Sequence, residues 1–195
     1  PTWFDYEKCF LNLLDTLKGK NVELHVVMDG DSNTNFIGKY KDHYTLHSIK
    51  AGGDQSSFFQ TWGIAKKIQM KPNDLVYFLE NDYMHTPNWV DKIMELFETF
   101  KLLHYVSLYD HKDKYFLPQY DDLVSKIFIT DHHHWRTTPS TCGSFIITRE
   151  LFDATMANNE GMGVLHKTLL DQLTNEAMRS ALKKAVIRTV EEINK

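Results

Sequence analysis

The feature that most constrains the fold is an unbroken apolar run, Leu75 to Leu79, which is followed at once by Glu80-Asn81-Asp82. The run has the length of a strand, and it lacks the polar alternation of a strand with one solvated face. It therefore predicts a central strand that helices cover on both faces. The polar residues then stand at the carboxyl end of that strand, where α/β proteins place their ligand crevice.

Helical and strand patterns alternate along the chain on both sides of this run. We expect helices over residues 6–17, 54–68 and 86–97, and strands over residues 22–28, 44–49, 75–79 and 104–109. This order predicts a single α/β domain of the doubly wound, Rossmann-like type over residues 1–195. Its central sheet is expected to be mostly parallel, with helices on both faces.

The second half of the sequence has a weaker pattern. Residues 112–139 form a polar and aromatic stretch, with one short strand expected at 126–130 and a loop over the run Asp131 to Arg136. Such loops often carry binding residues. A strand at 144–148, a helix at 149–156 and a long helix at 165–193 are expected to complete the domain.

Composition excludes several classes of function. A formal net charge of −4 argues against nucleic acid and anionic membranes as partners, because both favour a basic surface. No apolar run is long enough to span a bilayer, and residues 1–5 lack a signal-peptide pattern, so a cytoplasmic protein is expected. Cys9 and Cys142 are not in a metal-type spacing, which indicates two buried free thiols.

Two pairs of acidic residues follow predicted strands. Glu80 and Asp82 are one residue apart, so in an extended or turning segment both side chains can share one face. Their oxygens suit Mg²⁺ or Mn²⁺, which would then bridge diphosphate oxygens. The alternative is a pair of solvated acids that start the next helix, where the helix dipole favours negative charge. Asp29 and Asp31 repeat the arrangement, although taken alone they indicate an Asp-Gly turn.

The order of these motifs resembles the inverting, family 2-like glycosyltransferases of the GT-A fold over about residues 4–100. The matching pieces are Val26 to Ser32, Gly52 and Gly53 with Trp62 to Ala65, and Val76 to Asp82. Three further segments resemble a smaller set of bacterial and large-algal-virus (chlorovirus) glycosyltransferases. They are Tyr77 to Tyr83, Ser107 to His111, and His134 to Thr141. If the protein is viral, the expected location is the host cytoplasm.

The chain also departs from the family pattern. Glu80 replaces the first acid of the family's Asp-x-Asp motif. The family's first strand, which helps to hold the base of the nucleotide, would lie before Pro1.

The resemblance implies metal-assisted transfer of a hexose or deoxyhexose from a nucleoside-diphosphate sugar, expected to be a UDP-sugar, to a glycan hydroxyl with inversion. It implies that Asp82 binds Mn²⁺ or Mg²⁺ with Glu80 nearby. It also implies a donor site of Asp29 or Asp31 on the uridine, with the following residues near the ribose and phosphates: Gly52, Gly53, Asp54 and Asn81. Glycines allow close backbone approach to a phosphate, and a metal neutralises charge on a departing diphosphate.

An inverting transferase needs a base near the acceptor hydroxyl, and Asp171 is the candidate. The alternative for Asp171 is an exposed helical acid. His134, Trp135 and Arg136 are candidate contacts to acceptor or phosphate, with a surface loop and a packed Trp as the alternatives. Trp62 lies on an apolar helix face and, like Trp89, is interpreted as packing.

Three other classes of protein remain open at this stage. A sugar-nucleotide nucleotidyltransferase shares acidic strand ends but normally has a Gly-rich loop with Arg or Lys near its start, which this sequence lacks. A non-catalytic sugar- or nucleotide-binding module predicts binding without turnover and without metal. A flavodoxin-like regulator gives the same alternation but has no role for Glu80-Asn81-Asp82.

Overall fold

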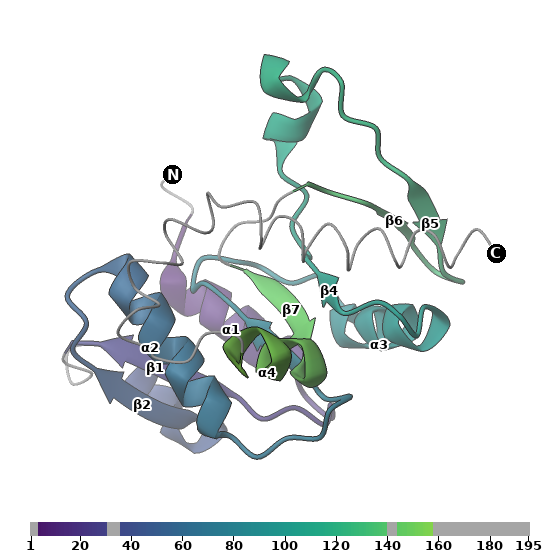
Figure 1. Cartoon of the computed structure of the whole chain (residues 1–195). Coiled ribbons are helices and arrows are strands. Elements are labelled where there is room, and N and C mark those ends of the chain that lie inside the picture. The colour runs from purple at the N-terminus through teal and green to yellow at the C-terminus, as the bar shows by residue number, and fades with distance from the viewer. Residues whose placement is uncertain (1–3, 31–35, 140–143, 158–195) are drawn as a thin grey trace.

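The structure, a computed structural model, describes residues 4–30, 36–139 and 144–157 and is a mixed α/β fold (Figure 1). Its α-helices are α1 (Tyr6–Thr16), α2 (Asp54–Lys67), α3 (Trp89–Thr99) and α4 (Arg149–Ala157). Its strands are β1 (His25–Asp29), β2 (Thr45–Ile49), β3 (Leu75–Phe78), β4 (Tyr105–Val106), β5 (Ile127–Ile129), β6 (His134–Arg136) and β7 (Phe145–Thr148). Short 3₁₀ helices are η2 (Phe36–His43), η3 (Lys112–Tyr115) and η4 (Pro118–Tyr120). None of the described helices is long and apolar enough to cross a membrane.

The side chains of β3 alternate between two hydrophobic clusters. Val76 and Phe78 pack in one cluster with residues of α2, β7 and α4. Leu75 and Tyr77 pack in the other with residues of α1, α3 and β7. The prediction of helices on both faces is confirmed, because α2 and α4 cover one face and α1 and α3 cover the other. Trp62 and Trp89 are both buried in these clusters, as expected.

The prediction of a mostly parallel central sheet is wrong for the described residues. β3 and β4 both pair antiparallel with β7, in the order β3-β7-β4. β1 and β2 form a separate parallel pair, and β5 pairs antiparallel with β6. An apolar run indicates that both faces of a strand are buried, but it says nothing about the direction of the neighbouring strand.

Three local expectations also need correction. α3 begins at Trp89 with Asn88 as its N-cap, in the left-handed conformation, rather than at Thr86. β4 has two residues where the expected strand covered 104–109. The run 131–136, expected as a loop, ends in strand β6, because residues 134–136 form an antiparallel ladder with β5. With η3 and η4 these two strands make an arm (residues 112–136) that projects from the rest of the chain in Figure 1.

β1 and β3 each leave one edge without a strand partner among the described residues. Even-numbered residues of β1 direct their backbone groups at β2, since the Leu24 carbonyl accepts from the Thr45 N–H. Even-numbered residues of β3 face β7, since the Asp74 carbonyl accepts from the Arg149 N–H. The odd-numbered residues of both strands therefore direct their N–H and C=O groups toward the open edges. These are His25, Val27 and Asp29 in β1, and Leu75 and Tyr77 in β3.

The same two helices, α1 and α2, lie next to both sheets. On one face, Leu17 after α1, Leu24 next to β1 and Leu75 of β3 all pack against the same hydrophobic cluster. On the other face, α2 contacts β2, and its Trp62 packs on β3. Backbone groups at half-buried strands normally have hydrogen-bond partners. Among the described residues these open edges belong to two different sheets, β1-β2 and β3-β7-β4.

Arg149 ties the helices of one face together. It is the first residue of α4 and is buried, with 8% of its surface exposed. Its guanidinium donates to the carbonyls of Ala65, Lys66 and Ile68 at the end of α2, at 2.8–3.1 Å, and to Asp153. It thus satisfies carbonyls that a helix C-terminus leaves without intrahelical partners.

We expect Arg149→Met to destabilise the fold by about 3 kcal/mol, because it leaves several buried carbonyls unpaired. Lys8→Met is the matched control, since Lys8 is exposed on α1. Urea unfolding followed by circular dichroism measures both variants. Equal stability of the two variants would contradict this role for Arg149.

Candidate functional site

An open depression lies where β1 and β2 end. Its volume is about 680 Å³, and its lining residues are Asp29, Gly30, Lys50, Ala51 and Gly52. We call it the glycine-lined depression. It brings Asp29, at the end of β1, close to Gly52, in the loop after β2, and both are predicted site residues.

Asp29 fastens the loop that follows β2. Its carboxylate accepts hydrogen bonds from the backbone N–H of Ala51 at 2.8 Å and of Gly52 at 3.1 Å, and from the Ser57 hydroxyl at 2.8 Å. The Ala51 N–H first, and then the Ser57 hydroxyl, lower the pKa of Asp29 below its usual value. Asp29 therefore stays ionised and holds β1, the loop and α2 in one arrangement.

Two glycines give the depression its shape. Gly30 has φ of 106° and Gly52 has φ of 73°, a region that residues with a Cβ rarely adopt. A Cβ at either position would meet no described atom within 4 Å, so the backbone is open to a neighbouring molecule. Lys50 adds a positive charge to the lining, and it forms no ion pair with any described residue. The lining thus carries one positive charge, from Lys50, and one negative charge, from Asp29.

Gly53 and Asp54 stand at the start of α2. Gly53 is the N-cap residue, and no side chain caps the first turn. Asp54 is exposed in that turn, where the helix dipole favours a negative charge. Both predicted donor residues therefore lie beside the glycine-lined depression.

The loop after β3, residues 80–85, carries the other predicted acids and is called the acidic loop. Glu80, Asn81 and Asp82 are all exposed. Ser144 accepts from the Glu80 N–H at 3.0 Å and donates to the Glu80 carboxylate at 3.4 Å. The Asp82 carboxylate has no hydrogen-bond or ion-pair partner among the described residues.

The acidic loop fits the demands of Mg²⁺ or Mn²⁺. The described residues contain no cluster of three or more His, Cys, Asp or Glu side chains that could hold a metal ion. Mg²⁺, however, usually binds through one or two carboxylates and completes its shell with water and substrate phosphates. Glu80 and Asp82 supply that number of carboxylates, both open to solvent.

A reciprocal pair of hydrogen bonds joins the acidic loop to α1. The Asn12 amide donates to the His85 carbonyl at 3.1 Å, and its oxygen accepts from the His85 N–H at 2.6 Å. Burial first, and then the charge of Asp82, raise the pKa of the Cys9 thiol. The first half of α1 therefore lies next to the acidic loop.

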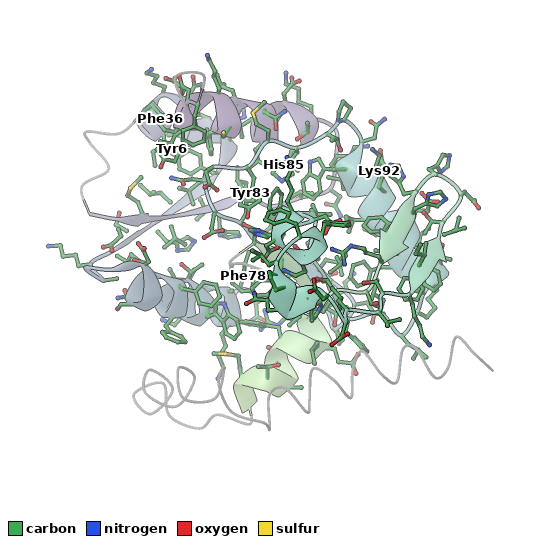
Figure 2. The ribbon with its side chains drawn as sticks, turned by 90° about the horizontal axis from the view of Figure 1, so that it is seen from above. Tyr6, Phe36, Phe78, Tyr83, His85 and Lys92 are labelled. Atoms are coloured by element: carbon green, nitrogen blue, oxygen red, sulfur yellow. The ribbon has the colours of Figure 1, made fainter. Side chains whose placement is uncertain are left out.

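His85 is the last residue of that loop, and its side chain is buried. Its Nε2 is hydrogen-bonded to the Tyr77 hydroxyl at 3.1 Å, and its ring packs against Trp89. Its Nδ1 has no hydrogen-bond partner among the residues that the structure describes. Burial lowers the pKa of His85 to about 4 and raises the pKa of Tyr77. Figure 2 shows His85 and Tyr83, the aromatic residues of this loop, near the middle of the molecule.

The three candidate acceptor contacts of β6 have different surroundings. His134 is exposed. Trp135 is half-buried against the cluster under α1 and α3, and its indole donates to Thr130. Arg136 donates to both carboxylate oxygens of Asp110 and stacks over Tyr115, with 5.0 Å from its guanidinium carbon to the ring centre. Trp135 and Arg136 therefore hold the arm to the rest of the chain.

Sequence reasoning missed three residues that matter in this geometry. Lys50 directly follows β2, and it lines the same depression as Asp29. Its position just after a predicted strand could have identified it as a candidate site residue. Asn12 and His85 are distant in sequence, and no spacing rule links them. Asp31 and Asp171, the remaining candidates, lie outside the described residues, as do Cys142 and the helix expected at 165–193.

Comparison of the chain with models of protein families, with curated proteins and with solved structures gave no match.

The buried His85 predicts a specific loss of stability in acid. The unfolded chain takes up a proton near pH 6.5, whereas the folded His85 resists protonation until about pH 4. Stability from this residue is therefore present above pH 6.5 and is lost as pH falls toward 4. We expect His85→Gln to remove up to about 3 kcal/mol of this pH dependence.

Urea unfolding at pH 7, 5.5 and 4.5 measures this effect. His43→Gln is the control, because His43 is exposed. If wild type and His85→Gln lose stability in parallel between pH 7 and 4.5, His85 is not the group that titrates.

Proposed function

We propose that this chain is a metal-assisted glycosyltransferase that moves a sugar from a nucleoside-diphosphate sugar, specifically a UDP-sugar, to a glycan hydroxyl. The observation that carries the proposal is that the glycine-lined depression follows β1 and β2 and the acidic loop follows β3, so that both features lie at the carboxyl ends of strands. α1 supports this placement. It runs from the acidic loop back to the start of β1, so the carboxyl ends of β1 and β3 point the same way.

The glycine-lined depression and the acidic loop have different roles in the proposed donor site. Lys50 receives the diphosphate, because a cation suits phosphate oxygens, and Gly30 and Gly52 allow the donor to approach the backbone closely. Asp29 keeps that loop in place and lines the uridine end. Glu80 and Asp82 hold Mn²⁺ or Mg²⁺, with Asn81 between them. The metal, when bound, neutralises negative charge on the departing diphosphate.

The remaining parts of the proposal depend on the resemblance. Direct displacement with inversion requires a base, and Asp171 is proposed for that role. The proposed location is the cytoplasm. The nucleotidyltransferase and the non-catalytic binding module are the rival interpretations, and the experiment on Asp82 below distinguishes the module by its lack of metal dependence.

We propose that the strands β1-β2 and β3-β7-β4 belong to one layer of the GT-A type. The observation in favour is the pair of open edges on β1 and β3, with α1 and α2 next to both sheets. A strand between them, from a segment preceding Phe4, would lead into α1 and then β1 as a right-handed crossover. Such a strand would satisfy both rows of backbone groups and end between the two halves of the donor site.

Hydrogen exchange tests the open edges directly. In the 195-residue chain, we expect the amides of Val27 and Tyr77 to exchange about 10-fold or more faster than those of Val26 and Val76, which face β2 and β7. Two-dimensional NMR in D₂O measures all four amides. Equal protection of each neighbouring pair would show that the edges already have partners.

Asp82→Asn tests the metal site. We expect the affinity for UDP in the presence of Mn²⁺ to fall by about 10-fold or more, because a neutral amide is a poor metal ligand. Isothermal titration of UDP with Mn²⁺, and again with chelator, measures the change. Asp42→Asn is the matched control, since Asp42 is exposed on η2.

Wild-type binding of UDP that survives the chelator would favour the non-catalytic module. Binding to Asp82→Asn that equals wild type in Mn²⁺ would refute the metal assignment.

A further inference from the structure

Three aromatic rings gather at the loop that follows β4. Tyr109 is 47% exposed and forms the centre of the group. The plane of the Tyr83 ring is at 80° to that of Tyr109, with 5.6 Å between ring centroids, and the plane of the His111 ring is at 89°, with 4.5 Å between centroids. We call these three residues the aromatic platform. No predicted site residue belongs to it.

The aromatic platform lies next to the acidic loop. Tyr83 directly follows Asp82 in the sequence. On the other side, Ser144 contacts Glu80, and the Ser107 hydroxyl is within hydrogen-bond distance of the Ser144 carbonyl at 3.4 Å. Two separate chains of contacts therefore lead from the predicted metal ligands to the loop of Tyr109.

The loop that carries Tyr109 is fixed on both sides. Before it, the Ser107 hydroxyl lies 3.3–3.4 Å from the N–H and the carbonyl of Tyr109. After it, Asp110 accepts from Arg136 and from the Tyr115 hydroxyl. Arg136 first, and then Tyr115, lower the pKa of the Asp110 carboxyl, so the ion pair persists at neutral pH. A ring held in this way loses little conformational entropy when a ligand stacks on it.

We infer that the aromatic platform is the binding surface for a pyranose ring of the acceptor glycan, stacked on Tyr109. The inference rests on the proposed function, because it assigns the second substrate of that same site. An exposed Tyr ring offers an apolar face and a polar hydroxyl, which match the C–H face and the hydroxyl rim of a pyranose. Asp82 precedes Tyr83 directly, so a pyranose on the aromatic platform would have a hydroxyl near the proposed metal.

A nucleobase is the other flat ligand that a tyrosine stacks. The contacts disfavour it, because the glycine-lined depression stands at the end of β1 and β2, whereas the aromatic platform stands at the end of β4. A donor that occupies the depression has its diphosphate near Lys50. The opposite side of the acidic loop is then free for the acceptor.

Fluorine NMR of protein labelled with 3-fluorotyrosine tests the inference. The resonance that is missing in Tyr109→Phe belongs to Tyr109. We expect methyl β-D-galactopyranoside or methyl β-D-glucopyranoside to shift that resonance in a saturable way, whereas UDP with Mg²⁺ leaves it in place. A shift caused by UDP and by neither glycoside would overturn the inference in favour of a nucleobase site.

Variants give the second test. We expect Tyr109→Ala to weaken glycoside binding by about fivefold or more, and Tyr109→Phe, which keeps the ring, to change it by less than about twofold. Tyr6→Ala is the matched control, because Tyr6 is 49% exposed and its ring contacts Phe4 rather than the aromatic platform. Equal binding by all four proteins would also overturn the inference.

The two proposals fail in different ways. If UDP binds with metal but no glycoside reaches Tyr109, the aromatic platform is refuted and the donor site remains. If a glycoside shifts Tyr109 but UDP never binds, the proposed transferase fails and the sugar-binding surface stands.

Discussion

The burial of β3 on both faces is the constraint on which the rest of the structure depends. Its side chains enter two separate hydrophobic clusters, one under α2 and α4 and the other under α1 and α3. A strand in that position cannot carry charge along its length, since an unpaired charge in such a core is costly. The first acids therefore appear only where the strand leaves the core, and Glu80 and Asp82 become exposed together.

Polar side chains around this core hold the loops of the site in place through hydrogen bonds. Asp29 fastens the loop after β2, Asn12 fastens the acidic loop, and Arg136 fastens the loop of Tyr109. Each of the three joins segments far apart in the sequence. The residues proposed to meet substrate are thus held by neighbours that need no contact with substrate themselves.

Apolar patterns predicted α1, α2 and β3, because apolar residues of each element pack in the two hydrophobic clusters. They could not predict pairing direction, since the apolar run of β3 fits parallel and antiparallel partners equally well. The candidate site was predictable where acids or glycines follow a strand directly, as at Asp29 and Gly52. It was not predictable where the contact is tertiary, as for Asn12 with His85.

The Asn12 side chain replaces a peptide group, because it presents one donor and one acceptor to the N–H and C=O of a single residue. These two hydrogen bonds join α1 to the end of the acidic loop. A slip of α1 by one helical turn, about 5.4 Å, would break both bonds at once and leave no intermediate arrangement. A displacement of α1 along its axis must therefore either break these bonds or carry the end of the acidic loop with it.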